Sequence, residues 1–133
     1  MRNQPQIIML ATPTAIPASL NVVSIERYFD LPPGSLLTKT RYREILMPRQ
    51  IAIWLDHNEY MEKHKVNGWS IIGRAYNLNH ASIIHNVKAV NNDLHNKTFK
   101  KMVYDIQLQI YGQIRYPYTP TEPDKERTKI YND

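Results

Sequence analysis

Cysteine is absent from the 133 residues of this chain, and its absence excludes whole classes of protein. Without thiols the chain can form neither a disulfide framework nor a thiolate zinc site, which excludes most small secreted scaffolds and zinc fingers. Long hydrophobic runs are missing too. Near the N-terminus the apolar run Ile7–Leu10 is much shorter than the core of a signal peptide or a membrane span. We therefore expect a cytoplasmic protein that does not enter a membrane.

Acidic residues are fewer than basic ones. The chain has 17 Lys and Arg against 12 Asp and Glu, which gives a formal net charge of +5 and an isoelectric point near 9.5. This balance favours an anionic partner such as nucleic acid or a membrane surface, although many basic proteins bind neither. The length indicates one domain, because single domains usually contain roughly 100–200 residues.

Proline-rich segments flank a central part that carries helix signals. Residues 1–18 contain three prolines and are predicted to form an irregular arm, whose apolar run Ile7–Leu10 is available for an edge strand or for docking on a partner. Residues 19–112 are predicted to form the folded domain. Residues 113–133 combine prolines with mixed charges and are predicted to form a disordered tail.

Hydrophobic periodicity predicts helices throughout the central part, so the fold class is all-α, a bundle of about five to six helices. Ser19 or Asn21 is expected to cap the first helix, Pro48 to lie in the first turn of the long one, and Asn79 and Thr98 to cap the last two. The predicted helices cover residues 22–29, 49–64, 70–76, 80–94 and 99–111, the last of them stopped by Gly112. The predicted core side chains are Val22, Ile25, Phe29, Ile51, Trp54, Leu55, Met61, Ile83, Ile84, Val87, Val90, Leu94, Phe99, Met102, Val103, Ile106 and Ile110.

The two helices predicted at residues 70–76 and 80–94 are joined by a short polar turn, residues 77–79. Two helices joined in this way, the second beginning with small and polar side chains, are the arrangement by which a helix-turn-helix delivers its second helix to the major groove of DNA. Many helical proteins show the same pattern. Taken alone, the pattern therefore favours ordinary helix packing over DNA binding.

Specific residues shift the interpretation toward DNA. Four groups follow one another along the chain: Arg41-x-Arg43, Pro48-Arg49-Gln50-Ile51-Ala52, Ile72-Gly73-x-Ala75-Tyr76 and His80-Ala81-Ser82-Ile83-Ile84-His85. This order, from about Val22 to Ile110, resembles the DNA-binding C-terminal domain of the bacterial replication initiator DnaA, a helix-turn-helix of the Trp-repressor-like kind. The resemblance implies sequence-specific binding of double-stranded DNA in replication initiation or its regulation, for example at the origin of a phage or mobile element. The alternatives are a transcriptional repressor and a protein–protein module that kept the fold and lost DNA binding.

The resemblance assigns Arg43 to the minor groove and Arg49 and Gln50 to the DNA backbone. A guanidinium on a basic loop can enter a minor groove, whose negative potential is deepest at A·T-rich sequence. Residues at the start of a long helix can hold a phosphate. On the recognition helix, His80 can donate or accept at a base edge and Ala81 can touch a thymine methyl. The full set predicted to bind DNA is Arg41, Arg43, Arg49, Gln50, Asn79, His80, Ala81, Ser82, His85 and Lys88.

The turn before the recognition helix departs from the family pattern. Asn79 stands where the family usually has Asp, and the turn is one residue shorter than the family's and lacks its Arg. Asn pairs bidentately with adenine whereas Asp accepts from cytosine. We therefore expect the preferred base at this point to differ from the family's.

Enzyme and metal functions find little support. The segment from Gly68 to Ala75 has the glycine spacing of a phosphate-binding loop but lacks the required Lys and Ser or Thr, so ATP hydrolysis is not expected. His80 and His85 are about 140° apart around a helix, too far to share one metal ion. We expect no enzyme activity and no cofactor. A replication initiator or another protein is a further candidate partner, through the arm or the tail.

Overall fold

The structure is a computed structural model that describes residues 19–119, and every regular element in that range is helical. The predicted all-α class is confirmed. The elements are α2 (Leu20–Tyr28), the 3-10 helix η1 (Ser35–Leu37), α3 (Arg43–His64), α4 (Trp69–Tyr76), α5 (His80–Asp93) and α6 (Lys97–Tyr111). The predicted arm, residues 1–18, and residues 120–133 of the predicted tail lie outside the described residues.

Local capping accounts for most helix ends. The side chains of Ser19 and Asn79 accept backbone N–H groups of α2 and α5, and Gly112 ends α6 with a φ of 76°, as the sequence predicts. The predicted cap of α6 is wrong. Asn96 caps this helix, since its side-chain oxygen accepts a hydrogen bond from the N–H of the third residue after it. Thr98 lies inside the first turn.

The long helix α3 begins at Arg43, not at Arg49, so the predicted first-turn position of Pro48 is wrong. Proline has no N–H to donate to the carbonyl of Glu44, but its fixed φ is compatible with a helix. The helix continues through the buried Pro48. Arg43, expected on a loop, is therefore the first residue of a helix. Arg49 and Gln50 lie well inside α3, where they are far from the positive end of the helix.

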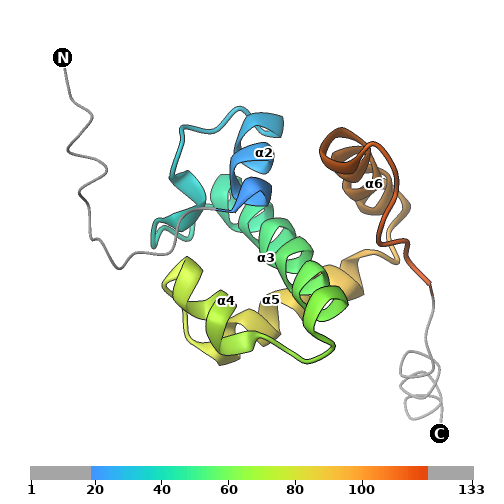
Figure 1. Cartoon of the computed structure of the whole chain (residues 1–133). Helices are drawn as coiled ribbons and strands as arrows, with labels where there is room; N and C mark the ends of the chain where they lie inside the picture. The colour runs from blue at the N-terminus through green and yellow to red at the C-terminus, as the bar shows by residue number, and fades with distance from the viewer. Residues whose placement is uncertain (1–18, 120–133) are drawn as a thin grey trace, which may run out of the picture. The chain divides into compact units, whose positions relative to one another are not determined.

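The chain divides into two compact units, and the first, up to Val90, is organised around α3. Within it α3 runs through the middle, with α2 on one side and α4 on the other (Figure 1). Met61, predicted to be in the core, is instead exposed in the last turns of α3, and Phe29 and Ile84 are half-buried. The buried apolar side chains of this unit are Val22, Ile25, Leu36, Ile51, Ala52, Ile53, Trp54, Leu55, Ile72, Tyr76, Ile83, Val87 and Val90.

The second unit begins at Asn91 and contains α6. Its buried Gln107 holds the segment after the helix: Oε1 accepts the N–H groups of Arg115 and Tyr116, at 2.9 and 2.7 Å, and Nε2 donates to the carbonyl of Tyr116. The N–H of Tyr118 donates to the hydroxyl of Tyr104 at 2.8 Å. Residues 113–119 are thus ordered on α6, and the prediction of a disordered tail is wrong for them.

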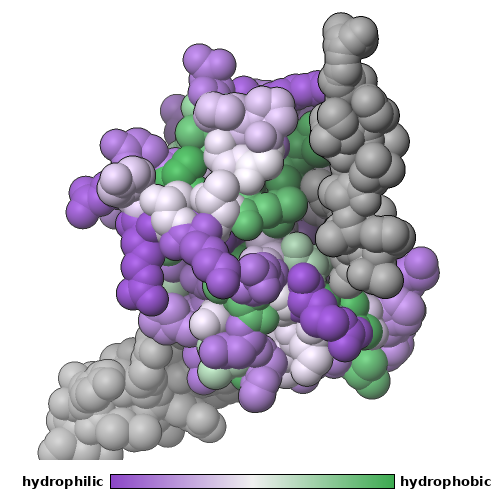
Figure 2. Space-filling view, turned by 90° about the vertical axis from the view of Figure 1, so that its left-hand side faces the viewer, coloured by the Kyte–Doolittle hydropathy of each residue, from purple (hydrophilic) through white to green (hydrophobic). Residues whose placement is uncertain are grey.

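The surface is largely polar. Figure 2 shows a face on which hydrophilic side chains surround separate hydrophobic patches. Exposed apolar residues such as Leu20 and Val66 do not by themselves indicate a partner, because scattered apolar side chains are normal on protein surfaces. Between residues 19 and 119, no helix has both the length and the apolar composition that a bilayer crossing requires.

A ring stack attaches the start of α4 to α3. The rings of His57 and Trp69 are 4.2 Å apart and nearly parallel, at 10°. His57 is 8% exposed, and its Nδ1 is the one buried side-chain nitrogen or oxygen within residues 19–119 that lacks a hydrogen-bond partner. Burial lowers the pKa of His57, because a charged imidazolium would have to be desolvated with one N–H unpaired.

This buried histidine predicts a loss of stability in mild acid. The folded pKa lies below the unfolded value of about 6.5, so the stability that His57 contributes is present above that pH and is lost as the pH falls through the folded pKa. We expect the midpoint of urea unfolding to decrease between pH 7.5 and 5 in the wild type. In His57→Phe, which keeps an aromatic ring against Trp69, the decrease should be smaller. Equal decreases in both proteins would exclude His57 as the cause.

Candidate nucleic-acid interface

A groove with a volume of about 720 Å³ opens between the loop after η1, the first half of α3 and the turn that leads into α5. It brings together seven of the ten residues predicted to bind DNA, namely Arg41, Arg49, Gln50, Asn79, Ala81, Ser82 and His85. Arg43, His80 and Lys88 are exposed but do not line it. The other lining residues were not predicted from the sequence, and they are Lys39, Leu46, Asn77, Leu78 and Asn86.

The turn between α4 and α5 is fixed by backbone geometry. Asn77 adopts the left-handed conformation with a φ of 59°. The N–H of Leu78 donates to the carbonyl of Gly73 at 2.8 Å, and the N–H of Asn77 donates to that of Arg74. This pair of bonds is the Schellman motif that commonly ends helices. The chain consequently reverses within residues 77–79 and delivers the start of α5 directly to the groove.

Gly73 makes this short turn possible. A Cβ atom at Gly73 would lie 2.5 Å from the carbonyl oxygen of Leu78, closer than real Cβ atoms approach a backbone atom. Glycine is the residue that allows such a close approach between two stretches of backbone. The Ile-Gly pair at residues 72 and 73, which contributes to the resemblance, therefore has a steric reason in this chain.

The loop between η1 and α3, residues 38–42, contains Lys39 and Arg41 and is called the basic loop below. Arg49 holds this loop in place and is 5% exposed. Its Nε donates to the carbonyl of Leu36 at 3.0 Å, and its Nη2 donates to the carbonyls of Thr38 and Thr40, both at 2.8 Å. From the other side, the buried Glu26 accepts the N–H of Leu36 at 3.1 Å. Two buried charged side chains thus fix the loop that carries Lys39 and Arg41.

A second buried polar contact joins α3 to α5. Gln50 donates through Nε2 to Oδ1 of Asn86 at 3.1 Å, and Asn86 is 7% exposed. Asn86 was not predicted as a site residue, although the sequence contains a signal for it. Asn86 follows Ile83 by three residues and precedes Val90 by four, which places a polar side chain on the buried stripe of α5. A polar residue at such a position needs a hydrogen-bond partner.

The charge of the groove is one-sided. Among the described residues that line it, Lys39, Arg41 and Arg49 are cationic and none is acidic. Lys39 and Arg41 are exposed, so their charges are available to an anion in the groove. The excess of positive charge in the composition is therefore concentrated in the groove where α5 begins.

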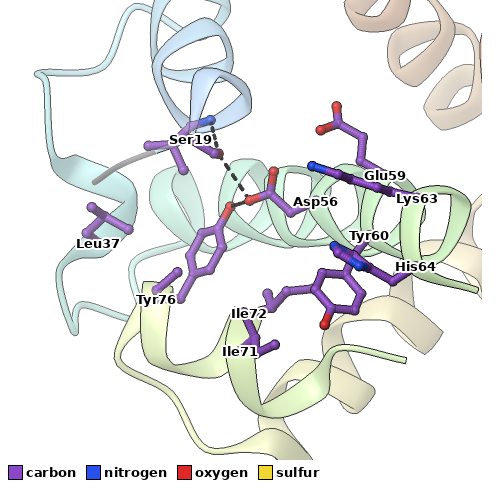
Figure 3. Close-up of a pocket in the computed structure, with 12 residues that line it drawn as sticks. Ser19, Leu37, Asp56, Glu59, Tyr60, Lys63, His64, Ile71, Ile72 and Tyr76 are labelled. Carbon is purple, nitrogen blue, oxygen red and sulfur yellow. Dashed lines mark hydrogen bonds between the residues drawn. The ribbon is translucent and has the colours of Figure 1, made fainter. Parts of the chain in front are cut away.

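A second cavity, of about 310 Å³, lies where the start of α2 meets α3 and α4 (Figure 3). At its centre the half-buried Asp56 accepts hydrogen bonds from Ser19 Oγ, Asn21 Nδ2 and the Tyr76 hydroxyl, at 3.1, 2.7 and 2.5 Å. Burial raises the pKa of Asp56, and the three hydrogen bonds oppose this rise. Because the carboxylate of Asp56, on α3, accepts hydrogen bonds from the start of α2 and from α4, this cavity is best explained as a structural junction of the three helices.

Within the described part of the chain, no cluster of three histidine or carboxylate side chains is arranged to hold a metal ion. The exposed His80 and His85 are therefore considered below only as polar groups on α5.

Comparisons with known proteins identify the same region. The family model described as the bacterial DnaA protein helix-turn-helix matches residues 21–90, which is more than half of the chain. The chain is also similar to the chromosomal replication initiator protein DnaA of Bacteroides thetaiotaomicron, with 34% identity over 82 residues. That alignment covers 61% of this chain and 17% of the relative. The chain thus spans less than a fifth of the length of this curated relative.

Proposed function

Since the chain belongs to the bacterial DnaA helix-turn-helix family, we propose that it binds double-stranded DNA at a specific sequence, with α5 as the recognition helix. The observation that carries this proposal is the groove between the basic loop and the start of α5. In duplex DNA a single sugar–phosphate strand separates the major groove from the neighbouring minor groove. A protein groove with a helix on one side and a basic loop on the other fits such a strand.

This placement gives each group a role that its chemistry supports. His80 and Ala81, exposed at the leading end of α5, reach base edges in the major groove. Ser82, His85 and Lys88 contact flanking phosphates from the same helix. On the other side of the strand, Arg41 and Arg43 reach the minor groove.

Arg49 and Gln50 act mainly by positioning. The donors of Arg49 are directed at the loop carbonyls, so this residue shapes the loop that presents Lys39 and Arg41. Gln50 is half-buried and bonded to Asn86, so it fixes α5 relative to α3. The second N–H of its amide nitrogen is the group that would donate to a phosphate.

The biological setting that we propose is replication initiation or its regulation, through binding at a replication origin. The name of the Bacteroides relative, a chromosomal replication initiator, supports this choice over transcriptional repression. A phage or another mobile element is one setting in which a domain of this kind would compete for the sites of a host initiator.

The decisive experiment is a selection of binding sites from random duplexes with the purified protein, followed by affinity measurements on the selected site. If about six phosphates are contacted, affinity should fall by a factor on the order of 10³ between 50 and 200 mM salt. If no sequence is enriched at low salt, the chain is instead a protein–protein module. Pull-down of a protein partner that resists high salt would then support that alternative.

Substitutions on the two sides of the groove test the proposed geometry. We expect His80→Ala to cost about 1–3 kcal/mol of binding free energy on the selected site and to relax the preference for one base pair. Arg41→Ala and Arg43→Ala should each cost a similar amount and weaken the preference for A·T pairs beside the motif. Lys101→Ala, an exposed position outside the groove, is the control for loss of one charge. Wild-type affinity in all three variants would refute the geometry.

A further inference from the structure

The cap of α5 fixes the orientation of the Asn79 side chain. Oδ1 of Asn79 accepts the backbone N–H of Ser82 at 2.9 Å. A backbone N–H can only donate, so the atom that faces the helix must be the amide oxygen and not the amide nitrogen. The carbonyl of Asn79 also accepts the N–H groups of Ser82 and Ile83, which ties this residue to the helix twice.

The amide nitrogen of Asn79 is left for a ligand. Asn79 is exposed and lines the groove beside Ala81 and Ser82. Among residues 19–119, no protein group accepts a hydrogen bond from its Nδ2. Two N–H donors are therefore available at the point where the turn meets the recognition helix.

On the basis of the proposed DNA binding, we propose that Asn79 is a specificity-determining residue that reads guanine as a donor. In the major groove, guanine presents two acceptors, O6 and N7, and no donor, which matches an amide nitrogen with two N–H groups. Cytosine presents only a donor. Thymine presents a single acceptor beside its methyl group.

Adenine, the base that Asn pairs with most often, fits less well in this chain. The bidentate pair with adenine needs the amide oxygen to accept from the N6 amino group while the nitrogen donates to N7. In Asn79 the oxygen is directed toward the N–H of Ser82. Turning it to the base would break the cap of α5. The residue type alone would predict that Asn79 reads adenine, whereas the orientation of its side chain favours guanine.

Asn79→Asp is the direct test, because Asp is an equally good N-cap and has the same shape. The variant keeps an oxygen for the N–H of Ser82 and replaces the donor by an acceptor. In a selection from random duplexes, we expect the wild type to enrich guanine at one position and Asn79→Asp to replace it by a base with a donor, cytosine or adenine. On the wild-type site, exchange of that guanine for cytosine should weaken wild-type binding by about 5- to 150-fold.

Asn79→Ser provides a second variant that keeps the cap but is too short to reach a base. It should bind sites with and without the guanine equally well, and its circular dichroism and thermal unfolding should match those of the wild type. If all three proteins enrich the same base at every position, or if the wild type requires adenine there, the inference is overturned while DNA binding stands. If the wild type enriches no motif at all, the proposed function itself fails.

Discussion

Arg49→Ala is expected to lower the free energy of unfolding by about 2–4 kcal/mol. The substitution leaves the carbonyls of Leu36, Thr38 and Thr40 without the donors that they have in the folded protein, and it opens a cavity at a side chain that is 5% exposed. Urea unfolding followed by circular dichroism measures the loss. Binding of DNA should weaken as well, because the loop that carries Arg41 is released.

Two comparisons separate this positioning role from a direct contact with phosphate. Arg41→Ala removes the same charge from an exposed site and should leave the unfolding free energy unchanged. Arg49→Lys keeps the charge but cannot reproduce the planar set of donors, so it should remain clearly destabilised. If Arg49 mainly held a phosphate, Arg49→Ala would unfold like the wild type and Arg49→Lys would retain most of the DNA affinity.

Gly73→Ala is expected to destabilise the protein by about 1–3 kcal/mol, although alanine favours a helix over glycine by about 1 kcal/mol. The new Cβ would meet the carbonyl oxygen of Leu78 at 2.5 Å, and a backbone atom can give way only if the whole turn moves. Such a movement shifts the start of α5. DNA affinity should therefore fall even at a temperature where the variant is fully folded, so that the loss of stability does not account for the weaker binding.

Ser70→Ala is the matched control for this prediction. Ser70 is exposed in the same helix, α4, so alanine there gains helix propensity without a clash. It should be as stable as the wild type or slightly more stable, with unchanged DNA affinity. Gly73→Ala behaving in the same way would mean that the turn can accommodate a side chain and that glycine is not required.

The helices could be predicted because their signals are local. A cap such as Ser19 or Asn79 needs one side-chain oxygen and an N–H three residues later, and both partners are visible in the sequence. The start of α3 could not be predicted in this way. Proline is compatible with the first turn of a helix, and also, at a cost in stability, with a position inside one. Which of the two occurs depends here on the half-buried Ile45 and Met47 before it, whose contacts are set by the tertiary fold.

The sequence predicts seven of the residues that line the groove as one group, but it does not predict what each of them contacts. Once α3 is extended to Arg43, Arg49 lies three and four residues before the buried Ala52 and Ile53, on the inner face of the helix. Its partners are loop carbonyls, and no sequence pattern shows where a loop places its carbonyls. The order of residues 113–119 depends in the same way on Gln107. This residue follows Val103 by four, which places it on the buried face of α6, but no sequence pattern shows which backbone groups of residues 113–119 it binds.

Pro48 gives the N-terminal end of α3 a local stability of its own. Helical hydrogen bonds normally make a helix cooperative, and the missing donor at Pro48 removes one link between residues 43–47 and the rest of α3. Opening this first segment breaks fewer interactions than global unfolding, so its amides are expected to exchange with solvent at a lower free energy than those of residues 51–55. Arg43 thus stands on a segment that can change its conformation while the core of the domain stays folded, which would let it fit the width of a minor groove in the proposed complex.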